Sequence, residues 1–245
     1  MRPLVSDRVK GIFKPPFDKV LSKADESTIT LSVDCVIFGL KNQALNVLLI
    51  KSDFPGYLNR WSLLGDIVEA DENLDEAAYR VLKERTGLDR LYLEQVQTFG
   101  KVNRHPAGRV ITVAYYSLVN IDQLDILKHD NELHWHQIEN ITDLAFDHTE
   151  ILNVCLQRLR VKIRTEPVGF KLLPENFTLR ELQSLYESVL SVTLDRRNFR
   201  KKFFSTGLLI DLGKYEMGVR HRPARLYNFD FDQYNLLQDK TIQFW

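Results

Sequence analysis

A cluster of carboxylates between residues 66 and 88 has the chemistry to hold a divalent cation. Hard ions such as Mg²⁺ prefer carboxylate oxygens, and once bound they can polarise a substrate and activate water. The acids of this segment are Asp66, Glu69, Asp71, Glu72, Asp75, Glu76 and Glu84. The alternative is a solvated helix face, because Glu76, Arg80 and Glu84 follow one another at intervals of four residues and can form ion pairs. Spacing alone leaves both interpretations open.

A second cluster, of cations, lies between Arg196 and Arg225, where nine Lys or Arg residues face two acids. In the helix predicted over DRRNFRKKFFST, Phe199 and Phe203 share one face and leave the basic residues on the other. Arginine can bind guanine with two hydrogen bonds, asparagine can bind adenine, and lysine contacts phosphates. A merely solvated basic surface is the alternative. The expected DNA contacts are Arg196, Arg197, Asn198, Arg200 and Lys201 on the helix, and Arg220, Arg222 and Arg225 on the following turn.

The elements around the carboxylates predict an α+β layer arrangement. Alternating apolar residues from Thr28 onward indicate two paired strands, and two more strand-like runs follow later. Between them, a helix is expected to begin after the capping residue Asn73 and to end at Gly87. A short HWH segment and a helix over about 147–162 complete this part, with Asp147 expected to cap the helix rather than bind a ligand.

The elements around the cations predict a winged helix-turn-helix order. The segment IRTEPVGFKLLPEN is interpreted as an extended piece, which places the domain boundary near 163–170. Thr178 and Glu181 then form a capping box ahead of a helix, the basic helix follows, and two short strands enclose the basic turn. The predicted organisation is an N-terminal extension (1–26) without an assigned function, an α+β domain (27–163) and a DNA-binding domain (164–245).

Composition narrows the class of protein further. The 245 residues carry 33 basic and 33 acidic side chains, so a nucleic-acid partner can be inferred only from where the charge is concentrated. The two cysteines, Cys35 and Cys155, lie among apolar residues and are expected to be buried thiols in a reducing compartment. No apolar run reaches the length of a signal peptide or a membrane span, so we expect a cytoplasmic protein without a membrane partner.

The segment from Asp66 to Leu88 resembles the signature of the Nudix hydrolases, G-x5-E-x7-R-E-U-x-E-E-x-G-U, where U is a bulky aliphatic residue. Six positions match the pattern and set its register: Glu72, Arg80, Leu82, Glu84, Gly87 and Leu88. Three positions depart from it, because Asp66 replaces the glycine and Val81 and Arg85 replace glutamates. The resemblance implies a Nudix α/β/α sandwich. The departures predict that its catalytic site is degenerate and holds no metal or cofactor. The protein is therefore not expected to be an enzyme.

The C-terminal part resembles the winged helix of the Nudix-related transcriptional regulators, on the run VGFKLLPENFTLRELQSLYESVL and the basic helix and turn after it. This resemblance implies a homodimer that binds a two-fold DNA operator and responds to a small effector. Val81, Arg85 and FKLLPENFTLRELQSLYE favour the sugar-responsive group, with a pentose such as arabinose as effector of a repressor. Regulation of NAD metabolism by ADP-ribose and an active hydrolase of ADP-ribose-like nucleotides are the alternatives. The expected ligand residues line the old catalytic cleft: Arg60, Trp61, Glu69, Glu72, Glu84 and Arg109.

Overall fold

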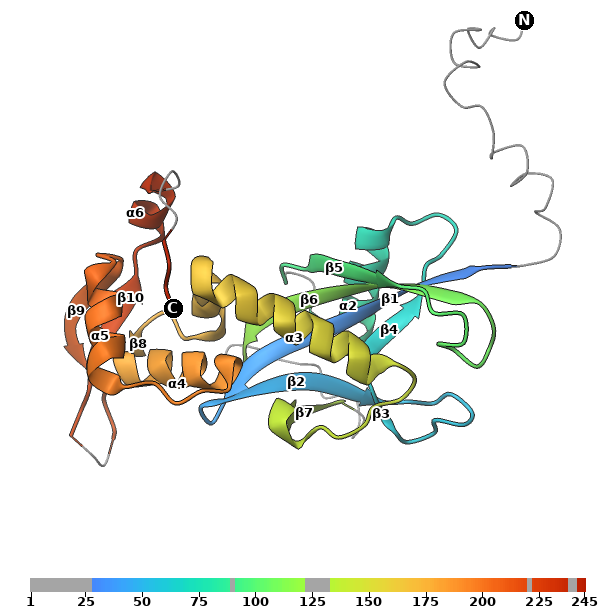
Figure 1. Cartoon of the computed structure of the whole chain (residues 1–245), viewed down its shortest axis with the longest axis horizontal. Coiled ribbons are helices and arrows are strands. Elements are labelled where there is room, and N and C mark those ends of the chain that lie inside the picture. Colours follow the sequence, from blue (N-terminus) through green and yellow to red (C-terminus); the bar gives the residue numbers. More distant parts are fainter. Residues whose placement is uncertain (1–27, 89–90, 122–132, 220–221, 238–241) are drawn as a thin grey trace, which may run out of the picture.

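The computed structural model describes residues 28–88, 91–121, 133–219, 222–237 and 242–245 (Figure 1). The N-terminal extension expected over 1–26 lies outside these residues. Within the described part of the chain, no helix is long and apolar enough to cross a membrane.

A mixed sheet of seven strands forms the N-terminal part of the molecule. Its main order is β3-β2-β1-β6-β5, with β4 paired to β1 and β7 paired to β2. β1 and β6 are parallel, and the other pairs are antiparallel. The strands are β1 (Thr30–Lys41), β2 (Ala44–Lys51), β3 (Trp61–Ser62), β4 (Leu64–Ile67), β5 (Glu94–Phe99), β6 (Val110–Asn120) and β7 (Leu133–Gln137).

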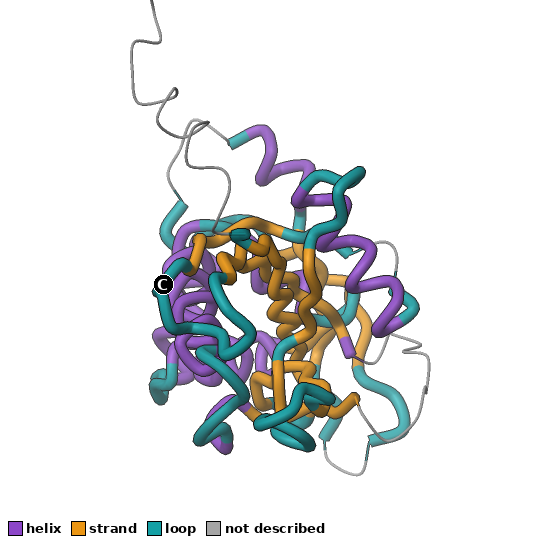
Figure 2. The backbone as a smooth tube through the Cα atoms, turned by 90° about the vertical axis from the view of Figure 1, so that its right-hand side faces the viewer, coloured by secondary structure: helices purple, strands orange, loops and turns teal. Residues whose placement is uncertain are grey.

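Helices cover both faces of this sheet, and Figure 2 shows the strands between them. The helix α2 (Leu74–Thr86) packs on one face through residues that include Val81 and Leu82. The capping box of Asn73 and Glu76 fixes its start, and Gly87 ends it with a positive φ of 76°, a conformation that glycine adopts at little cost. The predicted bounds of this helix are therefore confirmed. Because both faces of the sheet are covered, β1 is buried through its middle, from Val33 to Gly39.

The opposite face is covered by α3 (His148–Thr165), which extends into the C-terminal part of the molecule (Figure 1). The helix is three residues longer than expected at its C-terminal end. The segment after it is not extended, as the sequence had suggested, because the 3-10 helix Pro167–Leu172 begins directly behind α3. Two features account for this: proline suits the first position of a helix, and Phe170 and Leu172 are buried against the core.

A three-stranded sheet and its helices form the C-terminal part. The sheet order is β8-β10-β9, and the predicted capping box of Thr178 and Glu181 opens the first helix. Phe199 and Phe203 of the basic helix pack against Tyr186 with ring centroids 5.8 and 5.1 Å away. The elements are β8 (Phe177–Thr178), α4 (Leu179–Leu190), α5 (Arg196–Ser205), β9 (Leu209–Tyr215), β10 (Arg225–Phe229) and α6 (Phe231–Leu236).

The two parts share one continuous hydrophobic cluster, which runs from β1 and β2 through α3 to α4 and α5. Polar contacts join them as well. The Tyr186 hydroxyl donates to the carbonyl of Ile163 at 3.0 Å, and the backbone N–H of Leu45 donates to Ser188 Oγ at 2.6 Å. The β1–β2 hairpin and the end of α3 therefore fasten the C-terminal part to the first sheet.

Candidate ligand pocket and candidate DNA interface

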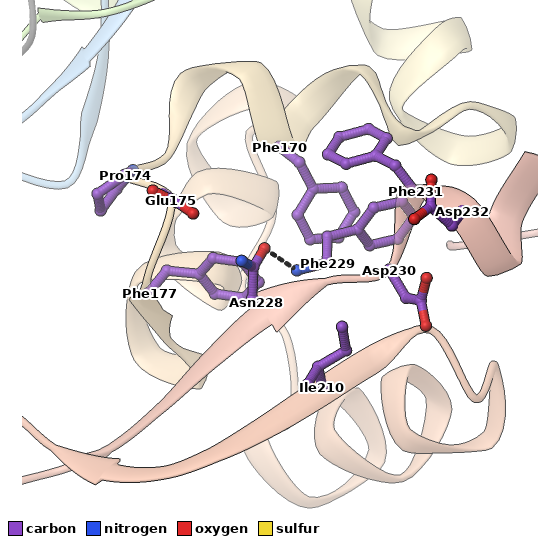
Figure 3. A pocket seen from close by; sticks show the side chains of 10 residues that line it. All are labelled: Phe170, Pro174, Glu175, Phe177, Ile210, Asn228, Phe229, Asp230, Phe231 and Asp232. Atoms are coloured by element: carbon purple, nitrogen blue, oxygen red, sulfur yellow. Dashed lines mark hydrogen bonds between the residues drawn. The ribbon is translucent and has the colours of Figure 1, made fainter.

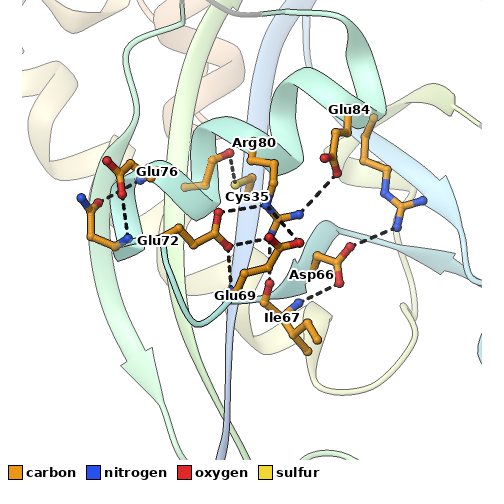
Figure 4. A network of polar contacts seen from close by, with 11 residues as sticks. Cys35, Asp66, Ile67, Glu69, Glu72, Glu76, Arg80 and Glu84 are labelled. Atoms are coloured by element: carbon orange, nitrogen blue, oxygen red, sulfur yellow. Dashed lines mark hydrogen bonds and ion pairs between the residues drawn. The ribbon is translucent and has the colours of Figure 1, made fainter.

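The matched residues of the Nudix-like segment form a polar network around Arg80 (Figure 4). The Arg80 guanidinium donates to both oxygens of Glu72, at 2.9 and 2.7 Å, and to Glu84 at 3.3 Å. It also donates to the carbonyl of Ile67 at 2.9 Å, and Glu69 Oε1 lies 4.0 Å from its Nε. The hydrogen bonds from Arg80 lower the pKa of Glu72 to about 2. The three carboxylates that the sequence proposed as ligand residues, Glu69, Glu72 and Glu84, thus surround one internal cation.

The residues that depart from the signature have structural roles of their own. Val81 is 1% exposed and packs in the core between α2 and the sheet. Arg85 and Asp66, at two of the altered positions, lie close together, with 3.6 Å between Arg85 Nη2 and Asp66 Oδ2 (Figure 4). In the described residues, no three His, Cys, Asp or Glu side chains converge into a group that could hold a metal ion. The donor set present does not fit the metal centre of an active Nudix hydrolase.

A second polar cluster, which sequence reasoning missed, is buried on the α3 side of the sheet. Arg104, whose side chain is 2% exposed, donates to both oxygens of Asp147 at 2.8 and 2.7 Å and lies 3.5 Å from Asp34. Asp147 occupies the N-cap position of α3, but its carboxylate makes no capping hydrogen bond, so the expected capping role is wrong at the side-chain level. The competing partner is Arg104, whose buried charge requires an anion.

His148 completes this buried cluster. Its Nδ1 accepts the backbone N–H of Leu63 at 3.0 Å, which leaves Nε2 to carry the hydrogen toward Asp34 Oδ1 at 3.4 Å. Burial lowers the pKa of His148, so the ring is held in its neutral form. No local sequence pattern indicated this cluster, because its members come from three separate parts of the chain: Asp34, Arg104, and the adjacent pair Asp147 and His148.

Aromatic residues and a hollow border this buried cluster. His105 and Phe146 stack with ring centroids 4.7 Å apart, and Tyr57 lies 4.4 Å from Phe146. A hollow of about 610 Å³ at the start of α3 is lined by Asp143, Phe146, Asp147, Thr149, Glu150, Asn153, Val154 and Gln157. Arg60 reaches its edge, where it pairs with Asp143 and lies 5.4 Å from the Tyr57 ring.

The six expected ligand residues do not form one group of contacting side chains. Glu69, Glu72 and Glu84 surround Arg80 on α2. Trp61 instead packs against His136 and His134 of β7, with ring centroids 4.3 and 5.3 Å away. Arg109 donates to the carbonyl of Gly100 at 2.7 Å. Two of the six, Trp61 and Arg109, are therefore held by contacts outside both polar clusters.

The helix α5 presents all five of its expected DNA-binding residues to solvent: Arg196, Arg197, Asn198, Arg200 and Lys201. Four of these five residues are cations, and none of the four forms an ion pair with another described residue. Asp195 caps the helix by accepting the backbone N–H of Asn198 at 2.8 Å. The buried Phe199 and Phe203 fix the opposite face. The arrangement leaves a row of uncompensated cations on one face of a short, well-anchored helix.

The cations in and beside the turn between β9 and β10 differ from those of α5. Arg220 lies outside the described residues, and Arg222 is exposed. Arg225 donates to Asp211 Oδ2 at 2.7 Å and lies 5.8 Å from the Tyr215 ring. These contacts raise the pKa of Arg225, with the nearby Asp211 carboxylate as the main cause. Arg225 therefore braces the hairpin, in addition to any contact that it makes with DNA.

Family models match both parts of the chain. Residues 28–155 match the NUDIX domain, and residues 169–229 match the NrtR DNA-binding winged helix domain. The fold and the two sites thus define a DNA-binding protein that carries a Nudix domain ahead of a winged helix, which confirms the expected fold class. The chain belongs to the NrtR family of transcriptional regulators. This assignment also confirms the expectation that the protein is a DNA-binding regulator.

Individual relatives support this assignment. The chain is 34% identical over 246 residues to an ADPR responsive transcriptional repressor of Acinetobacter baylyi, and the match covers 98% of each chain. It is 32% identical to Shewanella oneidensis NrtR solved with a 27mer DNA, with a TM-score of 0.71, covering 84% of this chain and 95% of that one. A MutT/nudix family protein of Enterococcus faecalis shares the fold at 22% identity, with a TM-score of 0.66 over 93% of this chain and all of that chain.

Proposed function

We propose that this chain is a transcriptional repressor whose affinity for its DNA operator is set by ADP-ribose. The observation that carries the proposal is the row of exposed, unpaired cations on α5 in a unit that matches a DNA-binding winged helix. The DNA-bound relative covers most of this chain at 32% identity, which supports α5 and the wing as the parts that contact DNA. In this proposal α5 enters the major groove and the turn after β9 follows the phosphates.

ADP-ribose replaces the pentose as the proposed effector. Nothing in the comparisons supports arabinose or carbohydrate sensing, whereas the relative that matches along 98% of the chain is described as responsive to ADPR. A diphosphate ligand needs cations, and the Nudix cleft offers Arg85, whose side chain is 41% exposed beside Asp66. Arg85 is proposed in addition to the six ligand residues expected from the sequence: Arg60, Trp61, Glu69, Glu72, Glu84 and Arg109.

We further propose that the chain senses ADP-ribose without hydrolysing it and acts as a homodimer. The inactive site follows from Val81 and Arg85, since a buried valine supplies no oxygen and an arginine repels a cation. The dimer follows from the two-fold operator that the family resemblance implies. In such a system the effector shifts the DNA-binding equilibrium only by binding the two forms unequally.

The test is a titration of the purified full chain with its own upstream DNA by fluorescence anisotropy. ADP-ribose is added in one series, and L-arabinose, as the matched control, in another. The expected result is specific DNA binding that responds to ADP-ribose and not to arabinose, with no Mg²⁺-dependent loss of ADP-ribose in a parallel assay. Rapid hydrolysis without specific DNA binding would overturn the proposal in favour of a Nudix hydrolase.

A further inference from the structure

Residues 242–245, here named the bridge segment, lie beside the last turn of α3 (Figure 1). The backbone N–H groups of Phe244 and Trp245 donate to the carbonyl of Arg164 at 2.7 and 3.4 Å. The last four carbonyls of an α-helix have no partner inside the helix, so the bridge segment satisfies one of these at the end of α3. Backbone hydrogen bonds therefore fasten the bridge segment to α3.

Phe244 anchors the bridge segment in the core of the winged-helix part. Its side chain is fully buried. Phe170 stacks on Phe229 of β10 with ring centroids 4.0 Å apart (Figure 3), and the Phe244 ring lies 6.3 and 6.1 Å from these two. The ring of Phe203, on the inner face of α5, lies 6.2 Å from Phe244. Because a ring enclosed in a close-packed core has one position, Phe244 fixes where the bridge segment lies.

Trp245 connects the bridge segment to the basic helix α5. Its half-buried indole lies 5.7 Å from the ring of Phe199, and the ammonium of Lys202 lies 5.7 Å from the indole centroid. These separations are in the range of favourable aromatic and cation–π contacts. Phe199 and Phe203 are the buried residues of α5, and each of them meets one ring of the bridge segment. The bridge segment thus links the inner face of α5 to the last turn of α3.

We propose that Trp245 is a positioning residue for DNA recognition, which holds α5 in a fixed orientation relative to α3 without contacting DNA itself. The inference rests on the proposed role of α5 in the major groove. Hydrogen bonds to base edges need a helix that is placed accurately, whereas long basic side chains still reach phosphates from a helix that has shifted. Loss of the Trp245 ring should therefore weaken specific binding far more than non-specific binding.

Fluorescence anisotropy with two duplexes tests the positioning role. The full chain is titrated with its own upstream DNA and with a scrambled duplex of the same length and composition, at one salt concentration. Trp245→Ala should weaken binding to the upstream DNA at least about tenfold, and binding to the scrambled duplex by less than about twofold. Unchanged binding to the upstream DNA, or equal losses on both duplexes, would overturn the proposal.

Two further variants separate positioning from a general loss of structure. Trp245→Phe keeps an aromatic ring beside Phe199 and should bind the upstream DNA within about threefold of the unaltered chain. Tyr79→Ala removes a ring that is 40% exposed on α2, and it should bind both duplexes normally. A Trp245→Phe protein as impaired as Trp245→Ala would contradict the proposal, because the ring contact would then not be what holds α5.

Hydrogen exchange followed by mass spectrometry tests the same contact without DNA. The backbone amides of α5 should exchange at least about threefold faster in Trp245→Ala than in the unaltered chain, and those of α2 should exchange at the same rate in both. Unchanged exchange in α5 would refute the positioning role. If the unaltered chain binds no DNA specifically, the proposed function fails, yet the exchange of α5 still decides whether Trp245 holds this helix.

Discussion

The two charged helices of this molecule, α2 and α5, treat their charges in opposite ways. Arg80 of α2 is paired with Glu84 of the same helix and with Glu72, which lies just before the helix begins. On α5 the cations Arg197 and Arg200 are exposed and unpaired within the described residues. Charges that are satisfied internally hold a structure in place, whereas charges left exposed in a row on one rigid face are available to a partner. The difference separates a cluster whose charges are paired within the protein from one whose charges can bind an external polyanion.

Removal of the unpaired cations should have the largest effect. Arg197→Ala with Arg200→Ala should cost about 2 to 6 kcal/mol of specific DNA-binding free energy, because two contacts to base edges or phosphates are lost. Gel-shift or anisotropy titration measures the loss. Arg158→Ala, an exposed arginine on α3, is the matched control and should bind DNA normally. Normal binding by the double variant would remove α5 from the interface.

The altered position Val81 should not tolerate the restored carboxylate. Val81→Glu places an acid in the core between α2 and the sheet, and it should lower the free energy of unfolding by about 3 to 5 kcal/mol. Val161→Glu, at a position on α3 that is 60% exposed, is the control and should change stability little. Urea denaturation distinguishes them. A stable Val81→Glu protein that hydrolyses ADP-ribose with Mg²⁺ would show instead that the core readily admits a metal ligand.

The stabilisation contributed by the pair of Glu72 and Arg80 should depend on pH. The folded pKa of Glu72, about 2, lies below the ordinary value of 4.5, so the stabilisation is complete above pH 4.5 and is lost as the pH falls toward 2. In Arg80→Met the main cause of the shift is absent, and the pKa of Glu72 should return toward 4.5. NMR titration of the Glu72 carboxyl carbon measures both values. An unchanged low pKa in the variant would mean that Arg80 does not control this site.

The smallest effect is expected at Arg225, a cation of the wing that is paired with Asp211. Because Asp211 holds its guanidinium, Arg225→Ala should weaken DNA binding by at most about fivefold. Arg222→Ala is the natural comparison, since Arg222 is exposed on the same turn. The same anisotropy titration serves both variants. A loss of more than about fivefold for Arg225→Ala would mean that the ion pair with Asp211 does not keep this guanidinium from contributing to DNA binding.

Features set by local chemistry were predictable from the sequence. The capping boxes at Asn73 and Thr178 specify helix starts within four residues, and both helices begin where predicted. The amphipathic pattern of α5 likewise gave its buried and exposed faces correctly. These signals need no knowledge of the rest of the fold, which is why a single sequence reveals them.

Features set by distant partners were not predictable. Arg104 meets Asp34 and Asp147 only because three segments converge at the start of α3, so no spacing in the sequence marks the cluster. The same limit explains the two errors at the ends of α3. At one end Arg104 takes the Asp147 carboxylate away from capping, and at the other tertiary packing makes 163–172 helical. The boundary of the expected domains remains a prediction.

The shared core also determines how this protein can be cut and recombined. A winged helix taken from a relative would have to match the tip of the β1–β2 hairpin, where Leu45 meets Ser188, and the last turn of α3, where Ile163 meets Tyr186. A chimaera joined between α3 and α4 would keep the chain continuous but place mismatched side chains across a buried seam. The workable exchange unit therefore includes the hairpin tip and the end of α3 together with the winged helix, although these pieces are separated along the chain.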